Sequence, residues 1–173
     1  HVTLPDGTVN EYAAGITCGE VITDALGKKH GCLAAKVDGF EFDMSHALDM
    51  NCSVEGIKSD SEDGIHILRH SAAHLLAQAV MELYPGALPT IGPAIDRGFY
   101  YDFAMEPIAE GDLKKIEKKM QELARRNFTV ERVELDQDSL REHFEHNPYK
   151  LEIIDDKLES LSAISVKCNS ACK

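Results

Sequence analysis

The sequence predicts an α+β protein divided into two domains. In residues 1–58, short runs of alternating apolar residues are separated by turn-forming residues, which is typical of strands and hairpins. From residue 65 onward, apolar residues recur at helical spacing over longer segments. The polar segment SDSEDG, residues 59–64, separates the two patterns and is the predicted linker. With 173 residues, of which 43% are hydrophobic, the chain is large enough to bury a sizeable core.

Two β-hairpins are predicted in the first domain. The first covers residues 1–12, with a Pro-Asp-Gly turn at residues 5–7. The second covers residues 32–44 and has an Asp-Gly turn at residues 38–39. Asp and Gly tolerate the dihedral angles that tight hairpin turns require, so both positions favour a direct reversal of the chain.

A short helix is predicted between the two hairpins. Thr17 is a good cap for a helix that begins at the next residue and ends near Gly31. Its apolar residues, expected to be buried, are Val21, Ile22, Ala25 and Leu26. With a last strand over residues 52–59, this order of elements predicts a ubiquitin-like (β-grasp) domain over residues 1–58.

The second domain, residues 65–173, is predicted to be a larger α+β domain in which helices pack on a mostly antiparallel sheet. A helix over residues 65–83 has an apolar stripe formed by Ile65, Leu68, Ala72, Leu75, Leu76, Ala79 and Leu83. A second helix over residues 110–128 turns Leu113, Ile116, Met120 and Leu123 inward. Between them, the Pro- and Gly-rich segment 85–103 ends in an aromatic strand. A short helix and three strands complete the domain, over residues 139–146, 129–135, 149–154 and 162–168.

The composition limits the classes of function. A net charge of −12 argues against binding nucleic acid by overall charge, so any RNA contact needs a local basic patch. One such cluster is Lys114, Lys115, Lys118, Lys119, Arg125 and Arg126. The alternative is a solvated helix face laced with i,i+4 pairs such as Glu122–Arg126. Five scattered cysteines favour a reducing compartment, and no apolar run is long enough to span a membrane. Because the first residue is His1, we expect the natural N-terminus to lie upstream.

Two histidines, His70 and His74, lie one helical turn apart in the predicted helix over residues 65–83. At this spacing they share a face roughly opposite the apolar stripe. Their neighbours on that face are Ala73, Ala77 and Met81, which suggests the wall of a cleft with a floor of small residues. The alternative is that the two histidines are ordinary solvated surface. His66, one turn earlier, belongs either to the same site or to exposed surface.

A pair of imidazoles can bind one metal ion or divide the roles of acid and base near neutral pH. The zinc-protease motif needs Glu directly after its first His, but Ser71 stands there. A zinc ion at the histidine pair would need a further ligand, for which Cys168 and Cys172 are candidates. The alternative is that these two cysteines are free thiols.

Four segments resemble the N-terminal half of the threonyl-tRNA synthetases: RHSAAHLLAQAV, PTIGPAIDRGFYYDF, LKKIEKKMQELARRN and PYKLEII. The match runs in order over residues 65–154, and its motifs are long. Residues 1–58 resemble the TGS domain, a β-grasp module, of the same family. The resemblance implies that residues 65–173 are an editing domain, which hydrolyses the ester of serine wrongly attached to tRNA(Thr).

The resemblance also implies a set of catalytic residues. The family's H-x3-H falls on His70 and His74, its tyrosine in G-F-Y-Y-D on Tyr101, and its lysine in Y-K on Lys150. The family cysteine in D-x-C-x3-H aligns best with Cys172. There the sequence departs from the family, because Ser170 replaces the aspartate and no histidine follows, so we expect a domain truncated at its C-terminal end.

These assignments give a hypothesis for ester hydrolysis. His70 and His74 would position or deprotonate a water molecule, directly or through a ribose hydroxyl. Lys150 would stabilise negative charge, and Tyr101 would hold the seryl group or the terminal adenosine. Alanine at Ala73 and Ala77 would leave room for the end of the tRNA. The alternatives are strand packing for Tyr101 and an ordinary exposed lysine for Lys150.

The resemblance further implies a cytoplasmic protein whose partners are the acceptor end of tRNA(Thr), seryl-tRNA and the rest of a synthetase that dimerises through its catalytic core. A chain of this length leaves no room for that aminoacylation core. Two other functions stay open. One is a non-catalytic module that docks tRNA or a regulatory partner, and the other is a metal hydrolase unrelated to tRNA.

Overall fold

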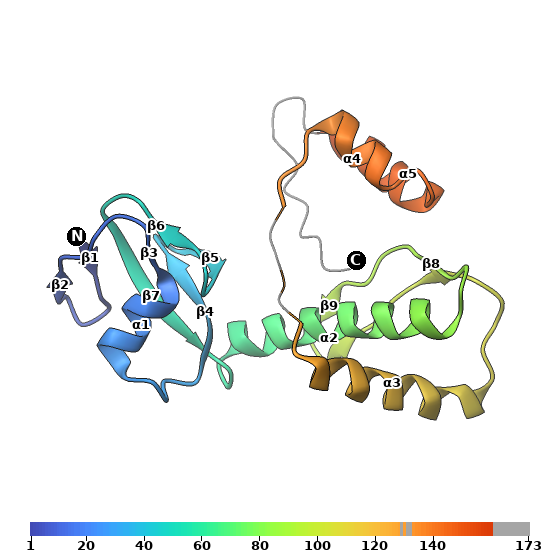
Figure 1. Ribbon diagram of the computed structural model, residues 1–173, viewed down its shortest axis with the longest axis horizontal. Coiled ribbons are helices and arrows are strands. Elements are labelled where there is room, and N and C mark those ends of the chain that lie inside the picture. The colour runs from blue at the N-terminus through green and yellow to red at the C-terminus, as the bar shows by residue number, and fades with distance from the viewer. Residues whose placement is uncertain (129, 131–132, 161–173) are drawn as a thin grey trace. The chain divides into compact units, whose positions relative to one another are not determined.

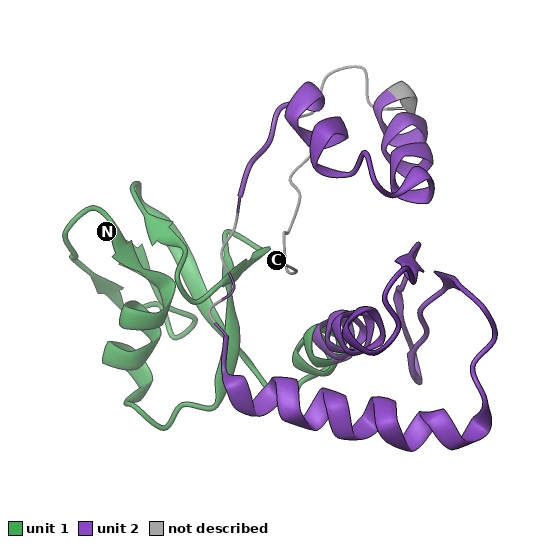
Figure 2. Ribbon diagram, turned by 45° about the vertical axis from the view of Figure 1, so that its right-hand side comes forward, with its two compact units in different colours: residues 1–68 green, residues 69–173 purple. Residues whose placement is uncertain are grey.

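A computed structural model describes residues 1–128, 130 and 133–160. The chain forms two compact units, His1–Leu68 and Arg69–Lys173 (Figure 2). Helix α2, Glu62–Leu83, begins inside the segment predicted as a linker and continues from the first unit into the second. Among the described residues, no helix has the length and apolarity needed to cross a membrane.

The first unit is built on a five-stranded sheet in the order β2-β1-β7-β4-β5 (Figure 1). Its strands are Val2–Thr3 (β1), Val9–Asn10 (β2), Cys32–Val37 (β4), Phe40–Asp43 (β5) and Cys52–Lys58 (β7). β1 pairs with β7 in parallel, and the other pairs are antiparallel. Both predicted hairpins and the predicted last strand are confirmed. Their turns form where Gly7 and Gly39 adopt positive φ angles of 84°, as the turn residues indicated.

Helix α1, Cys18–Leu26, packs against β4 and β7 of this sheet. The predicted cap is confirmed. The Thr17 hydroxyl oxygen accepts a hydrogen bond from the backbone amide of Glu20, and the backbone amide of Thr17 donates one to the Glu20 carboxylate. The helix ends at Gly27, whose φ of 82° stops it, so the predicted end near Gly31 was wrong. A short ladder joins Ile16–Thr17 (β3) and Ala47–Leu48 (β6).

The core of the first unit lies between α1 and the sheet. Its buried residues are Val2, Cys18, Val21, Ile22, Ala35, Val37, Leu48, Cys52 and Val54. Ala25 and Leu26 are exposed, contrary to the prediction, because the last turn of α1 carries them beyond this cluster. Cys18 is a free thiol, and burial raises its pKa to about 11, so this sulfur is a packing group rather than a nucleophile.

In the second unit, α2 packs beside α3, Leu113–Arg126, which follows a short 3-10 turn, Glu110–Asp112 (η1; Figure 1). Their shared core contains Ala79, Val80, Ala87, Ile116 and Leu123. Ile116 and Leu123 face inward as predicted, whereas Leu113 is exposed at the first position of its helix. Ile65 and Leu68 are also exposed, because α2 contributes to this core only from Leu75 onward.

The segment between α2 and α3 forms two short antiparallel ladders. Leu88–Pro89 (β8) pairs with Phe103–Ala104 (β11), and Ala94–Ile95 (β9) pairs with Gly98–Phe99 (β10). Two further backbone bonds extend the first ladder. The amide of Thr90 donates to the carbonyl oxygen of Asp102, and the amide of Asp102 donates to the carbonyl oxygen of Ile91. The described part of this unit therefore carries small ladders, and the molecule as a whole is α+β with mostly antiparallel pairing.

Two helices follow α3 in the described chain. Gln137–His143 (α4) confirms the predicted short helix, with Asp136 as its cap. Pro148–Ser160 (α5) replaces the strand predicted over residues 149–154, because the chain starts a capped helix at Pro148. The strand predicted over residues 129–135 lies partly outside the described residues, and its described residues are in no strand. The strand predicted over residues 162–168 lies wholly outside them.

Candidate functional site

The two histidines of α2 face each other. The Nε2 atoms of His70 and His74 are 3.0 Å apart, and the rings meet edge to face with centroids separated by 4.6 Å. A hydrogen bond at this distance requires one ring nitrogen to donate and the other to accept, so at least one ring must present an unprotonated Nε2. The i,i+4 spacing on a helix is what aligns the two rings, as the sequence predicted.

The surroundings of His74 disfavour its protonated form. Its side chain is half-buried, whereas that of His70 is exposed. Burial lowers the pKa of His74, and the charges of His70 and Lys150 lower it further. A histidine with a lowered pKa holds a free lone pair at neutral pH, which is the form that accepts a proton.

Lys150 lies on a helix instead of the predicted strand, and its charge acts on the pKa of His74. It lies in the first turn of α5 and is half-buried. The structure thus brings together three of the predicted residues, His70, His74 and Lys150. Two imidazoles with an ammonium group close enough to act on one of them could chemically supply a proton acceptor and a positive charge for a developing anion.

The predicted floor of small residues is not open. Ala73 and Ala77 are 0% and 3% exposed, so protein covers α2 at these two positions, although His70 on the same face is exposed. Alanine allows another element to approach a helix closely, and here the small side chains serve packing. The expectation that these two alanines leave room for a tRNA end was therefore wrong. His66, in contrast, is exposed.

Tyr101 is a half-buried residue between β10 and β11. Its ring stacks on Phe103 with centroids 5.0 Å apart and an angle of 27° between the rings. The ring also covers Gly92, where a Cβ atom would lie only 2.0 Å from Cδ2 of Tyr101. These contacts are the aromatic packing that the sequence left open as the alternative. They also identify Gly92, which the sequence analysis missed, as the residue on which this ring rests.

Asn147 was also missed. It is a buried residue directly before α5, and its side chain links the start of that helix to β8 through a bond from Nδ2 to the carbonyl oxygen of Pro89. The Asn147-Pro148 dipeptide was a usable signal, since Asn is a favoured helix cap and Pro a favoured first helical residue.

We expect the pKa of His74 to lie below its ordinary value of 6.5 and to rise in Lys150→Met, because that substitution removes a nearby positive charge. Titration of the imidazole signals by NMR measures both values. Lys114→Met, on the exposed side of α3, is the control and should leave the pKa of His74 unchanged. Since the folded state binds fewer protons than the unfolded chain, this histidine favours folding above pH 6.5 and its contribution is lost as the pH falls through the folded value.

The residues from 1 to 160 that the structure describes include no group of three His, Cys, Asp or Glu side chains that could hold a metal ion. Cys168 and Cys172, the proposed further ligands, lie outside the described residues. The predicted catalytic role of Cys172 therefore stays a prediction. Zinc at the histidine pair therefore stays a prediction.

The basic cluster on α3 divides into two halves. One half is paired with acids: Lys115 with Asp112 at 2.6 Å, Lys119 with Glu82 at 3.1 Å, and Arg126 with Glu122. The other half consists of Lys114, Lys118 and Arg125, which are exposed and have no ion pair within the described part of the chain. Positions i, i+4 and i+11 place these three on one stripe of the helix, opposite Leu123.

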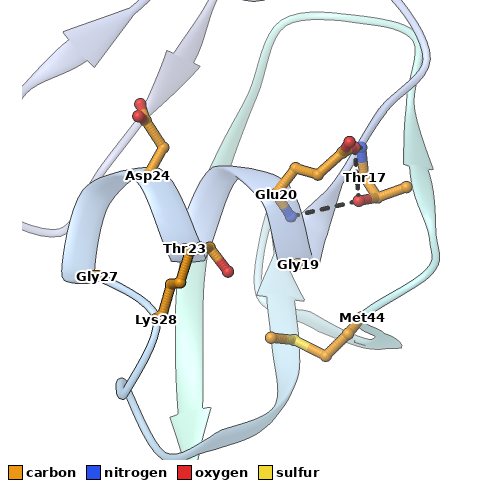
Figure 3. Close-up of a pocket in the computed structure, with 8 residues that line it drawn as sticks. All are labelled: Thr17, Gly19, Glu20, Thr23, Asp24, Gly27, Lys28 and Met44. Atoms are coloured by element: carbon orange, nitrogen blue, oxygen red, sulfur yellow. Dashed lines mark hydrogen bonds between the residues drawn. The ribbon is translucent and has the colours of Figure 1, made fainter.

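An open pocket lies beside α1 in the first unit (Figure 3). Its lining residues are Thr17, Gly19, Glu20, Thr23, Asp24, Gly27, Lys28 and Met44. Glu20 already completes the helix cap, and Asp24 accepts a hydrogen bond from the Tyr12 hydroxyl at 2.9 Å. Both acidic side chains of this pocket, Glu20 and Asp24, are therefore engaged in contacts that hold the fold.

The relatives of the chain include threonine–tRNA ligases of two different organisms. The chain is 46% identical over 160 residues to that of Alkalilimnicola ehrlichii, which covers 90% of this chain and 25% of the relative. It is 40% identical over 171 residues to that of Streptococcus pneumoniae, covering 96% of this chain and 26% of the relative. No family model matches the chain. The chain spans about a quarter of the length of these relatives and, over nearly all of its own length, is homologous to threonyl-tRNA synthetases.

Proposed function

We propose that the chain hydrolyses the aminoacyl ester of seryl-tRNA(Thr), as the editing part of a threonyl-tRNA synthetase acting in the cytoplasm. The observation that carries this proposal is the histidine pair. Its Nε2 atoms are 3.0 Å apart, and the pKa of His74 is lowered by burial and by the charges of His70 and Lys150. The homology to threonine–tRNA ligases supports the synthetase context. The strand order of the first unit supports a β-grasp TGS domain over residues 1–58, and the segment from residue 65 to 173 is the proposed editing domain.

The need for such a site follows from the small difference between the two amino acids. Serine lacks one methyl group of threonine, and a pocket shaped for the larger molecule rejects the smaller one by only about 10- to 200-fold. A second site that hydrolyses the wrong ester adds a further factor. The chemistry then requires an activated water, a positive group for the anion, and a proton for the leaving oxygen.

His74 supplies the first of these requirements. In the proposed step, a water oxygen attacks the ester carbonyl carbon while the imidazole of His74 accepts its proton. In this step Nε2–H of His74 donates to Nε2 of His70, which fixes the ring and leaves Nδ1 of His74 as the atom that accepts the proton of water. The bond between the carbonyl carbon and the ribose oxygen then breaks, the proton passes to that ribose oxygen, and serine and uncharged tRNA leave.

Lys150 supplies the positive charge. The ester oxygen becomes negative as the tetrahedral intermediate forms, and an ammonium group beside the histidine pair lowers the energy of that state. Tyr101 is proposed to hold the seryl group or the terminal adenosine, with its ring supported by Gly92. The exposed stripe of Lys114, Lys118 and Arg125 is the proposed contact for the tRNA backbone, because phosphates attract unpaired cations.

The experiment is to incubate the chain with seryl-tRNA(Thr) and, separately, with threonyl-tRNA(Thr), and to follow release of each amino acid. We expect faster release of serine than the uncatalysed rate, with the threonyl ester largely retained. Release of neither amino acid, together with retained binding of the tRNA, would instead indicate the non-catalytic docking module. Equal hydrolysis in metal-free buffer with chelator would reject a metal-dependent hydrolase.

A further inference from the structure

Asn147 is the one buried side chain with polar or charged atoms within the described residues, at 2% exposure. Its amide is bonded at both ends to backbone groups that are far apart in the sequence. The Nδ2 group donates to the carbonyl oxygen of Pro89 at 2.9 Å, and Oδ1 accepts from the backbone amide of Lys150 at 3.2 Å. Burial of an amide is costly unless its donors and acceptors are satisfied, so the bonds define where this side chain must sit.

The bonds of Asn147 fix the first turn of α5. Its backbone carbonyl also receives the amides of Lys150 and Leu151, at 3.1 and 3.2 Å. The helix therefore starts from a residue that is itself anchored to β8, and β8 is held in turn by its pairing with β11. Lys150 is only three residues from the anchor, so a shift of Asn147 would move the lysine with it.

We propose that Asn147 is a positioning residue, which holds Lys150 beside the histidine pair by tying the first turn of α5 to β8. A simple helix cap would not need this arrangement. Asp136, the cap of α4, is exposed, and among the residues that the structure describes its side chain bonds within its own turn, to the amide of Ser139 at 2.8 Å. Asn147 makes the same kind of cap bond but adds a second, buried bond to a different element.

The inference rests on the proposed function only in giving Lys150 a catalytic role. The placement of Lys150 can be measured separately, through its effect on the pKa of His74. The test therefore has one readout that needs activity and one that does not.

The test uses four variants of the chain. Asn147→Ser keeps a good helix cap but is too short to reach Pro89, Lys150→Met removes the charge, and the third variant combines the two. Asp136→Ala is the matched control, which loses a cap without touching Lys150. Circular dichroism shows that each variant is folded at the temperature of the measurements.

We expect Asn147→Ser to slow seryl-tRNA hydrolysis by about 10- to 100-fold and to raise the pKa of His74, as Lys150→Met does. The double variant should be no slower than Lys150→Met alone, because a residue that acts only through the lysine has no effect once the lysine charge is gone. Asp136→Ala should change neither readout.

Two results would overturn the inference. One is an unchanged pKa of His74 in Asn147→Ser while Lys150→Met raises it. The other is an additive loss of rate in the double variant, which would mean that Asn147 acts on the fold and not through Lys150. A chain that does not hydrolyse seryl-tRNA at all would reject the proposed function, whereas the pKa comparison would still decide whether Asn147 places the lysine.

Discussion

Replacing both His70 and His74 by alanine is expected to slow the hydrolysis of seryl-tRNA(Thr) by at least about 100-fold. General acid–base groups contribute about 10²- to 10⁴-fold to the rates of such reactions, and the two rings share one hydrogen bond. The measurement is the rate of serine release at saturating enzyme. The two single variants should each lose nearly as much as the double variant, because residues that act as a unit have non-additive effects.

The control for this prediction is His66→Ala. His66 is exposed on the same helix, one turn before His70, and has no part in the hydrogen-bonded pair. Its removal should leave the rate unchanged. An undiminished rate in the double variant would contradict the catalytic assignment of the pair.

Gly92→Ala is expected to lower both the stability of the protein and its binding of seryl-tRNA. The added Cβ would lie 2.0 to 2.6 Å from three ring atoms of Tyr101, including Cγ, which is too close to the backbone to move freely. The ring must therefore leave its place on Phe103, and the ladder formed by β8 and β11 must shift with it. We expect a loss of stability of about 1 to 3 kcal/mol, the usual range for forcing extra atoms into a packed site, together with weaker binding of seryl-tRNA.

Chemical denaturation measures the first effect, and the Michaelis constant for seryl-tRNA measures the second. Gly111→Ala is the matched control, since its Cβ would meet nothing within 4 Å and its backbone is not in the positive-φ region. A Gly92→Ala variant with the stability and substrate binding of the parent chain would show that the ring of Tyr101 is not held there.

The sequence predicted the first unit well because its signals are local. The turns at residues 5–7 and 38–39 and the cap at Thr17 act through neighbouring residues, and all three form as expected. The strand predicted over residues 149–154 was wrong because another local signal, the start of a helix, was missed. Its β-branched Ile153 and Ile154 favour a strand, but Asn147 and Pro148 start a helix that carries both residues along.

Only part of the candidate site could be predicted from the sequence. Spacing alone aligned His70 with His74, because a helix sets that geometry. The meeting of Lys150 with His74 depends on how α5 packs, and the bond from Asn147 to Pro89 joins residues 58 positions apart. The small size of the alanines beside the histidines is compatible with an open surface and with close packing. Only the tertiary structure decides between these two, and it shows that the alanines are buried.

If the exposed stripe on α3 contacts RNA as proposed, the division of the α3 cations limits how strongly salt weakens that contact. Lys115, Lys119 and Arg126 are already neutralised by carboxylates, so they displace few ions from a nucleic acid. The exposed stripe offers three charges, which corresponds to a slope of about −2 to −3 in a plot of log affinity against log salt concentration. Six free cations would give about twice that slope. Carboxylates of η1, α2 and α3 itself pair the other three cations. The proposed contact of α3 with a polyanion is therefore expected to be weak and reversible, which would suit a site that releases each tRNA after inspection.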